Sequence, residues 1–179
     1  NPIMKIGFTG TMSVGKTTLV NALKDRAEFK NYTFATERSK HLRDLGIPLN
    51  TDSTIKGQVI FLAERCSELL QLNMVTDRTV IDVMAFTSLA KSIPIRYADD
   101  YCKLAVNLIK EYDYIFYISP EGIPIEDNGV REIDSQYRTK IDNSIQNIIK
   151  NNKKYIRNYR ELSGTTEERV DKIISSIFY

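Results

Sequence analysis

Histidine and cysteine are scarce in this sequence, and their scarcity limits the chemistry that its side chains can support. His41 is the single histidine, so a Ser-His-Asp triad or a histidine-ligated metal site has no convincing set of residues. The two cysteines, Cys66 and Cys102, lack CxxC spacing, which argues against a disulfide framework and a zinc site. This sparing use of cysteine is typical of a reducing compartment, and we expect a cytoplasmic protein.

The sequence also lacks a large excess of either charge sign and any long apolar run. The 25 basic and 23 acidic residues leave a net charge of +2, so composition gives no support to nucleic-acid binding. No run of 18 apolar residues occurs and the N-terminus lacks a signal-peptide pattern, so we expect no membrane partner. The 179 residues are enough to bury a sizeable core, and we expect a single domain over residues 1–179.

Short apolar runs alternate with amphipathic patterns along the chain, which is typical of a parallel βαβ architecture. We expect strands at 3–10, 32–37, 73–77, 112–119 and 154–162. Helical patterns cover 16–27, 53–72, 80–91, 96–112, 133–151 and 163–178. In the helix at 53–72 we expect an apolar stripe to face the core, formed by Ile55, Val59, Leu62, Cys66, Leu69 and Leu70. Together these elements predict an α/β fold, a three-layer α/β/α sandwich around a central parallel sheet of about five strands.

The most specific motif is "GTMSVGKT", which matches the phosphate-binding pattern GxxxxGK[ST] between a hydrophobic strand and an amphipathic helix. Its glycines allow the backbone to curl so that successive N–H groups point at phosphate oxygens. Lys16 adds a full positive charge for the β- and γ-phosphates, and the Thr17 hydroxyl can ligate Mg2+. The motif therefore predicts binding of ATP with Mg2+. The predicted nucleotide-binding residues are Gly10, Thr11, Met12, Ser13, Val14, Gly15, Lys16, Thr17 and Thr18.

A phosphate-binding loop (P-loop) identifies a phosphoryl donor and leaves the reaction open. The sequence lacks the NKxD and DxxG arrangements that mark guanine recognition in GTPases, and it is too short for a motor ATPase with a helical lid domain. Its length fits a kinase of small metabolites best. The alternative is a nucleotide-binding switch or ATPase that acts through a protein partner, although few residues look suited to positioning a water molecule.

Two further segments carry a resemblance to a known family. "VTDRTVIDVMAFTSLA" at 75–90 resembles the DR…D…AY segment of the P-loop nucleoside/nucleotide kinase superfamily. "EDNGVREIDSQYRTKIDNSI" at 126–145 resembles the DGVR…D…R…ID stretch of the ribosylnicotinamide-kinase-like ATP-binding domains, which are common in phages. The chain is also similar to the thymidylate kinase group. The resemblance implies the P-loop NTPase fold and ATP-dependent phosphoryl transfer to a nucleoside or nucleotide.

The resemblance gives roles to two residues that follow the predicted strand at 73–77. Asp77 would lie at the carboxyl edge of the sheet beside the P-loop, where ligands bind in open α/β sheets. The resemblance implies that Asp77 coordinates Mg2+ or takes the proton of an attacking hydroxyl. It also implies that Arg78 contacts the acceptor or the transferring phosphoryl group. Asp82, one helical turn beyond, could orient Arg78. The alternative for Asp77 is an acid that caps the next helix.

Charged residues outside that segment complete the predicted catalytic set. Glu37 and Arg38 end the strand at 32–37, where related kinases place acceptor-binding or general-base residues; a surface ion pair is the alternative. Arg131 and Arg138 lie in an expected lid segment at 119–140 and would stabilise the charge of the transferring phosphoryl group. A solvated helix face explains these two arginines as well.

The acceptor stays open at the level of sequence. Thymidylate kinases usually follow Asp-Arg with an aromatic residue and later show Ala-Tyr-Gln, whereas this chain has Thr79 and then Ala85-Phe86-Thr87, which puts thymidylate specificity in doubt. Similar phage enzymes phosphorylate 5-hydroxymethyluracil in DNA, and the basic segment at 150–160 is either a nucleic-acid contact or a polar loop. The expected partner is a small nucleoside or nucleotide, or DNA carrying a modified base. If a phage encodes the chain, the compartment is the host cytoplasm. A homodimer is one candidate assembly, which the sequence does not decide.

Overall fold

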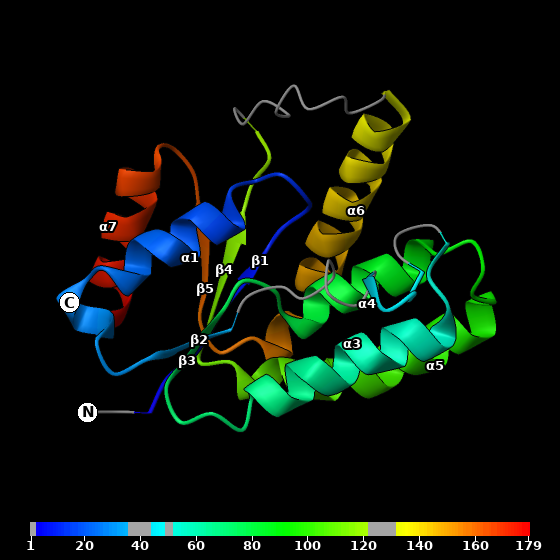
Figure 1. The fold of residues 1–179 in the computed structure, drawn as a ribbon, viewed down its shortest axis with the longest axis horizontal. Coiled ribbons are helices and arrows are strands. Elements are labelled where there is room, and N and C mark those ends of the chain that lie inside the picture. The colour runs from blue at the N-terminus through cyan, green and yellow to red at the C-terminus, as the bar shows by residue number, and fades with distance from the viewer. Residues whose placement is uncertain (1–2, 36–43, 49–51, 122–131) are drawn as a thin grey trace.

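Five parallel strands form the centre of the molecule (Figure 1). The computed structural model describes residues 3–35, 44–48, 52–121 and 132–179. The strands are β1 (Lys5–Thr9), β2 (Thr33–Ala35), β3 (Met74–Thr76), β4 (Tyr114–Ile118) and β5 (Tyr159–Leu162). They lie in the order β2-β3-β1-β4-β5, and every neighbouring pair is parallel. The expected parallel sheet of about five strands is confirmed.

The strands are apolar on both sides because helices cover both faces of the sheet. Along β4, Ile115 and Tyr117 point into the hydrophobic core on one face, and Phe116 and Ile118 point into the core on the other. The two cores make the molecule a three-layer α/β/α sandwich, which agrees with the expected fold class.

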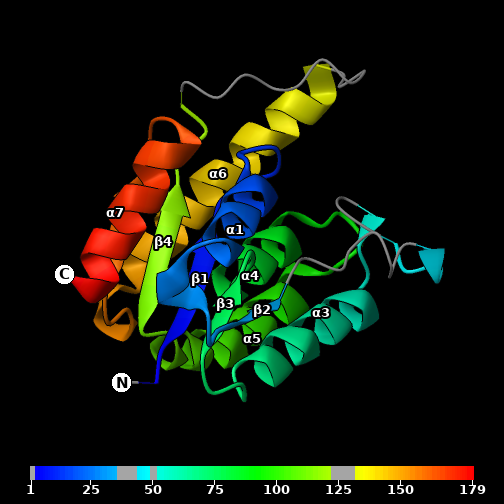
Figure 2. The same ribbon diagram turned by 60° about the vertical axis from the view of Figure 1, so that its left-hand side comes forward.

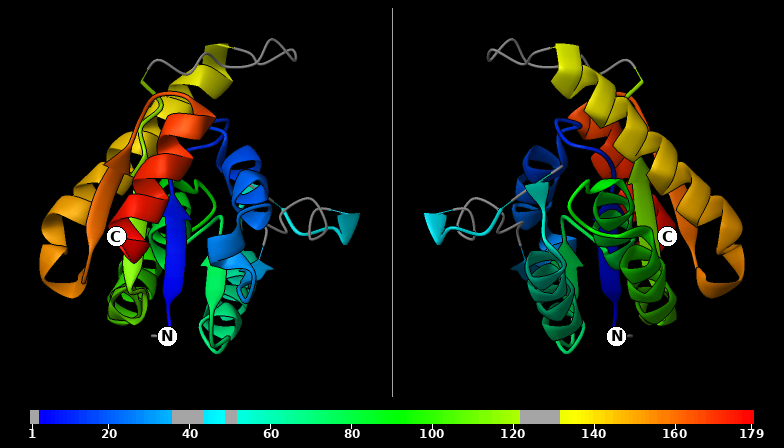
Figure 3. Two further views of the ribbon diagram at one scale, coloured as in Figure 1. Left: turned by 90° about the vertical axis from the view of Figure 1, so that its left-hand side faces the viewer. Right: turned by 90° about the vertical axis from the view of Figure 1, so that its right-hand side faces the viewer.

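Helices α1 (Lys16–Lys24) and α7 (Thr166–Phe178) cover one face. Helices α3 (Ile55–Glu68), α4 (Val80–Leu89), α5 (Ile95–Ala105) and α6 (Glu132–Asn151) cover the other. Figure 3 shows the two groups on opposite sides of the sheet. Short 3-10 turns at Ala27–Phe29, Val106–Glu111 and Lys153–Tyr155 complete the described elements.

The topology places the P-loop strand in the middle of the sheet. The connection from β1 to β2 runs outward over one face through α1, and the later connections, through α3, α4 with α5, and α6, run the opposite way over the other face. A single handedness of crossover produces this arrangement. The chain segments that follow β1, β3 and β4 therefore meet at one edge of the sheet, the edge where ligands bind in such folds (Figure 2).

The apolar stripe expected on the helix at 53–72 is wrong in part. Leu62 and Leu69 are buried, but Val59 is 52% exposed and Leu70 is 81% exposed. The face of α3 that packs inward instead carries Gly57, Gln58, Phe61, Leu62 and Arg65. Arg65 is fully buried because Glu68, one turn further along, accepts two hydrogen bonds from its guanidinium. No helix within the described ranges is both long and apolar enough to cross a membrane.

Candidate functional site

The P-loop follows β1 and leads directly into α1, as its sequence motif predicts. At Gly10 a Cβ atom would lie only 3.1 Å from the Ile118 carbonyl oxygen, so the loop passes close to β4. Gly15 has a φ of 80°, a conformation that favours glycine, and Ser13 also adopts a positive φ of 61°. Helix α1 begins at Lys16, so its unpaired N–H groups and its positive dipole end lie at this loop.

Arginines from two distant helices hold the carbonyl groups of the P-loop. Arg138 of α6 donates from Nε to the Met12 carbonyl at 2.9 Å and from Nη2 to the Ser13 carbonyl at 3.2 Å. Arg169 of α7, which is 6% exposed, donates from Nη1 to the Val14 carbonyl at 3.1 Å. With these carbonyls engaged by arginines, the loop is held in the curled form that presents N–H groups to an anion. The sequence does not predict the role of Arg169, because no local pattern links this residue to the P-loop.

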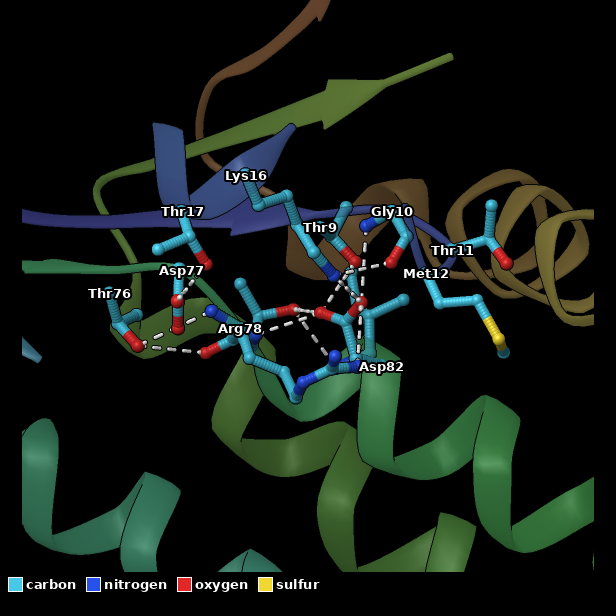
Figure 4. A network of polar contacts seen from close by, with 12 residues as sticks. Thr9, Gly10, Thr11, Met12, Lys16, Thr17, Thr76, Asp77, Arg78 and Asp82 are labelled. Carbon is cyan, nitrogen blue, oxygen red and sulfur yellow. Dashed lines mark hydrogen bonds and ion pairs between the residues drawn. The ribbon is translucent and has the colours of Figure 1, made fainter. Parts of the chain in front are cut away.

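Lys16 is buried and turned back on its own loop in this structure. Its Nζ donates to the Gly10 carbonyl at 2.5 Å and lies 3.4 Å from Oδ1 of Asp82 (Figure 4). Burial and, next, the nearby Arg78 guanidinium lower the pKa of Lys16 to about 8, although Asp82 and Asp77 oppose the shift. Lys16 is therefore a cation at neutral pH that carries a desolvation cost, and it would regain favourable interactions on contact with phosphate.

Asp82, at the start of α4, joins the P-loop to the segment that follows β3. Its Oδ2 accepts hydrogen bonds from Thr9 Oγ1 and from the Thr79 N–H, both at 2.8 Å, and its Oδ1 accepts from the Gly10 N–H at 3.1 Å. Nη1 of Arg78 lies 3.8 Å from Oδ1, so Asp82 does contact Arg78 as the one-turn spacing suggested. Figure 4 shows the Asp82 carboxylate between Lys16 and Arg78.

The electrostatics of Asp82 follow from this position. Complete burial alone would raise the pKa of Asp82, but Lys16, Arg78 and the N–H groups of Thr79 and Gly10 outweigh burial and hold that pKa below its usual value. The carboxylate is therefore ionised throughout the neutral range. The buried Asp82 carboxylate is thus the counter-charge of two cations, Lys16 on one side and Arg78 on the other.

Thr17 and Asp77, the two residues predicted to hold Mg2+, lie side by side. The Thr17 hydroxyl donates to Oδ2 of Asp77 at 3.4 Å. A hydroxyl and a carboxylate are hard oxygen ligands of the kind that Mg2+ takes from proteins, and phosphates and water usually complete its shell. The pair fits a magnesium ion, even though no cluster of three or more ligating side chains occurs within the described ranges.

The alternative interpretation of Asp77, as a helix cap, is wrong. Thr79 caps α4: its hydroxyl accepts from the Ile81 N–H at 3.1 Å, and Asp82 bonds back to the Thr79 N–H, which completes a capping box. Asp77 is 1% exposed and lies just beyond the end of β3, facing Thr17 of α1. The cap therefore leaves the Asp77 carboxylate at the carboxyl edge of the sheet.

A buried network supports the turn at Asp77 and Arg78 from below. The Thr76 hydroxyl lies 3.0 Å from both the Arg78 carbonyl and Oε2 of Glu68. Glu68 is in turn bonded to Arg65 at 2.9 Å and 2.6 Å. The network ties the turn to helix α3 and limits how far the Arg78 backbone can move.

The structure brings together most of the residues predicted for the site. Lys16, Thr17, Asp77, Arg78 and Arg138 all adjoin the P-loop or the turn after β3. Glu37, Arg38 and Arg131 lie outside the described residues, as do residues 122–131 of the expected lid segment at 119–140. Arg138 is described, and its guanidinium is engaged with P-loop carbonyls.

Fold and site together define a chain with the P-loop nucleoside/nucleotide kinase fold. The sequence matches the AAA domain family over residues 5–169, nearly its whole length, and the chain belongs to this family. No curated protein matches it.

Solved structures of two kinases and of a NadR protein share the fold. Deoxyadenosine kinase from M. mycoides is 18% identical with a TM-score of 0.70, and the match covers 97% of this chain and 98% of that one. Thymidylate kinase from Candida albicans is 17% identical with a TM-score of 0.69, over 98% and 91% of the two chains. A NadR protein solved with NAD and AMP-PNP is 15% identical with a TM-score of 0.70; there 97% of this chain matches only 49% of the larger protein.

Proposed function

We propose that this chain is an ATP- and magnesium-dependent kinase that transfers the γ-phosphoryl group to a nucleoside, a nucleotide or a nucleotide-like acceptor. The observation that carries the proposal is the buried chain of contacts from Lys16 through Asp82 to Arg78. It connects a phosphate-binding lysine to a second cationic group at the carboxyl edge of the sheet. A pure nucleotide-binding protein needs the first group and has no evident use for the second.

The donor side of the site follows from the P-loop. On binding ATP, Lys16 would exchange the Gly10 carbonyl for the β- and γ-phosphates, and the N–H groups at the start of α1 would bind the same oxygens. Arg138 and Arg169 would keep the loop in its curled form during the reaction. Thr17 and Asp77 would hold Mg2+, which supplies charge stabilisation for the phosphates when bound.

The acceptor side follows from the segment after β3. Arg78, fixed by Asp82, would bind the acceptor or the transferring phosphoryl group. A hydroxyl acceptor would need a base for its proton, for which Asp77 and Glu37 are the candidates. Arg131 would approach from the lid segment and stabilise the equatorial oxygens. A hydroxymethylated pyrimidine in DNA remains one candidate acceptor.

The proposal is tested by incubating the protein with Mg2+ and γ-labelled ATP together with nucleosides, nucleoside monophosphates, ribosylnicotinamide and duplex DNA containing 5-hydroxymethyluracil. Label should appear on one acceptor class, and Lys16→Ala should abolish the transfer, whereas substitution of the exposed Lys172 should not. Release of inorganic phosphate alone, with nucleotide-dependent binding of a protein partner, would favour a switch and contradict the proposal.

A further inference from the structure

Three side chains beside the P-loop, none of them part of the loop itself, form a cluster. The Arg78 guanidinium carbon lies 5.0 Å from the centre of the Phe86 ring, and the Tyr137 ring centre lies 6.4 Å from that of Phe86. Arg78 precedes α4, Phe86 lies on α4 and Tyr137 lies on α6, so two separate helices build the cluster. We call these residues the 78/86/137 cluster.

The cluster offers hydrogen-bond donors that no described residue accepts. Nε and Nη1 of Arg78 and the Tyr137 hydroxyl are buried and make no hydrogen bond to the part of the chain that the structure describes. Asp82 lies 3.8 Å from Nη1 of Arg78, which is an ion pair beyond hydrogen-bond length. Burial raises the pKa of the Tyr137 hydroxyl to about 12, so the group keeps its proton at neutral pH. Buried donors without a partner are costly, and three of them in one cluster point to a ligand that supplies the acceptors.

The place of the cluster relative to the P-loop separates it from the donor site. Asp82 lies between Lys16 on one side and Arg78 on the other. Tyr137 is next to Arg138, whose guanidinium holds the Met12 carbonyl, so the cluster adjoins the P-loop from the α4 and α6 side. A group bound by Arg78 would therefore face the γ-phosphate held by Lys16, with Asp82 between the two cations.

We infer that the 78/86/137 cluster binds the phosphate of a nucleoside monophosphate, and that Tyr137 is a specificity-determining residue for this acceptor. The inference rests on the kinase function proposed above. A guanidinium edge and a phenol hydroxyl match the oxygens of a phosphate, which accepts several charge-assisted hydrogen bonds. The half-buried Phe86 ring holds the guanidinium in place through a cation–π contact. The free hydroxyl of a nucleoside would leave most of these donors unpaired.

The chemistry of the transfer follows from this assignment. An oxygen of the acceptor phosphate attacks the γ-phosphorus, the bond from that phosphorus to the β–γ bridging oxygen breaks, and its electron pair leaves with ADP. Above about pH 8 the acceptor phosphate is already doubly ionised, because its second pKa is about 6. No proton is released and no general base is required. Transfer to a hydroxyl, in contrast, releases one proton for each phosphoryl group moved.

Direct binding tests the inference without relying on turnover. Calorimetry measures the affinity of the protein, saturated with Mg2+ and AMP-PNP, for dTMP, dCMP, dAMP and dGMP and for the four matching nucleosides. At least one monophosphate should bind ten-fold or more tightly than its nucleoside. Tyr137→Phe removes only the hydroxyl and should weaken that binding about ten-fold, while the affinity for AMP-PNP stays unchanged. Tyr155→Phe, in the 3-10 turn Lys153–Tyr155 that follows α6, is the matched control and should match the wild type.

The outcomes separate this inference from the proposed function. Two results would overturn the inference even if the protein is a kinase. One is that nucleosides or duplex DNA with 5-hydroxymethyluracil bind as tightly as monophosphates. The other is that Tyr137→Phe binds monophosphates as tightly as the wild type does. Conversely, selective monophosphate binding lost in Tyr137→Phe, with no phosphoryl transfer, would support the site and reject the kinase. With an active enzyme, a pH-stat at pH 8.5 adds a second readout, since net proton release during transfer contradicts a phosphate acceptor.

Discussion

Replacing Asp82 with asparagine should uncouple the two cations of the site. The substitution keeps the shape of the side chain but removes the negative charge that lies 3.4 Å from Lys16 and 3.8 Å from Arg78. At an effective dielectric constant of about 20, these two distances correspond to gross attractions of about 5 and about 4 kcal/mol. The loss of these attractions is comparable to the whole unfolding free energy of an ordinary domain, about 5–15 kcal/mol, so the site must respond to it.

Deprotonation of Lys16 is the least costly response. Because the pKa of Lys16 is about 8, loss of its proton at pH 7.5 costs less than about 1 kcal/mol. Keeping both buried cations without a counter-charge would cost about 3–5 kcal/mol. Asp82→Asn should therefore fold with a neutral Lys16, at a pH where the wild-type lysine is still charged.

Nucleotide affinity as a function of pH gives the readout. The bound phosphates favour the charged lysine, so wild-type affinity for an ADP analogue should fall by about ten-fold per pH unit above pH 8. In Asp82→Asn the same decline should begin at least about one unit lower. Asp142→Asn is the matched control, because Asp142 is a buried carboxylate that bonds Tyr117 and Gln146 rather than Lys16. If the nucleotide affinity of Asp82→Asn begins to fall at the same pH as that of the wild type, the reasoning is refuted.

Three further predictions concern the P-loop and its supports. Between about pH 8 and 10.5, Lys16 is protonated in the unfolded chain and largely neutral in the folded chain. The unfolding free energy of the wild type should therefore rise across this pH window, relative to that of Lys16→Met, by about 3 kcal/mol at most. Urea denaturation at a series of pH values measures this difference. Arg138→Met or Arg169→Met should each weaken nucleotide binding about ten-fold by releasing a P-loop carbonyl, whereas Arg160→Met, on the exposed edge, should not; equal affinities in calorimetry would contradict the bracing role. Thr17→Val should leave metal-free nucleotide affinity unchanged and abolish the gain on adding Mg2+, and a retained gain would remove Thr17 from the metal site.

Local signals account for the parts of the structure that the sequence predicts well. The strand, glycine loop and helix at residues 5–24 are contiguous, so the motif alone predicts their order, although Arg138 and Arg169 support the loop from distant helices. Asp77 follows a short buried strand, and the parallel topology alone brings it to the edge that carries Thr17.

Contacts between distant residues account for what the sequence misses. Arg169 and Val14 are 155 positions apart in the sequence, and Lys16 and Asp82 are 66 positions apart. Hydrophobic periodicity predicts local structure only, so it does not predict contacts at such sequence separations. The inward face of α3 was predicted wrongly in part, because a hydrophobic pattern treats Arg65 as exposed. The buried ion pair of Arg65 with Glu68 reverses that preference, and the helix turns Val59 to solvent instead.

The transfer of label from γ-labelled ATP to nucleoside monophosphates and nucleosides tests the central claim most directly. The site predicts Mg2+-dependent formation of labelled nucleoside diphosphate, lost in Lys16→Ala and strongly reduced in Arg78→Ala. Labelled inorganic phosphate as the sole product, at the same rate with and without every acceptor, would contradict the claim that this chain is a kinase.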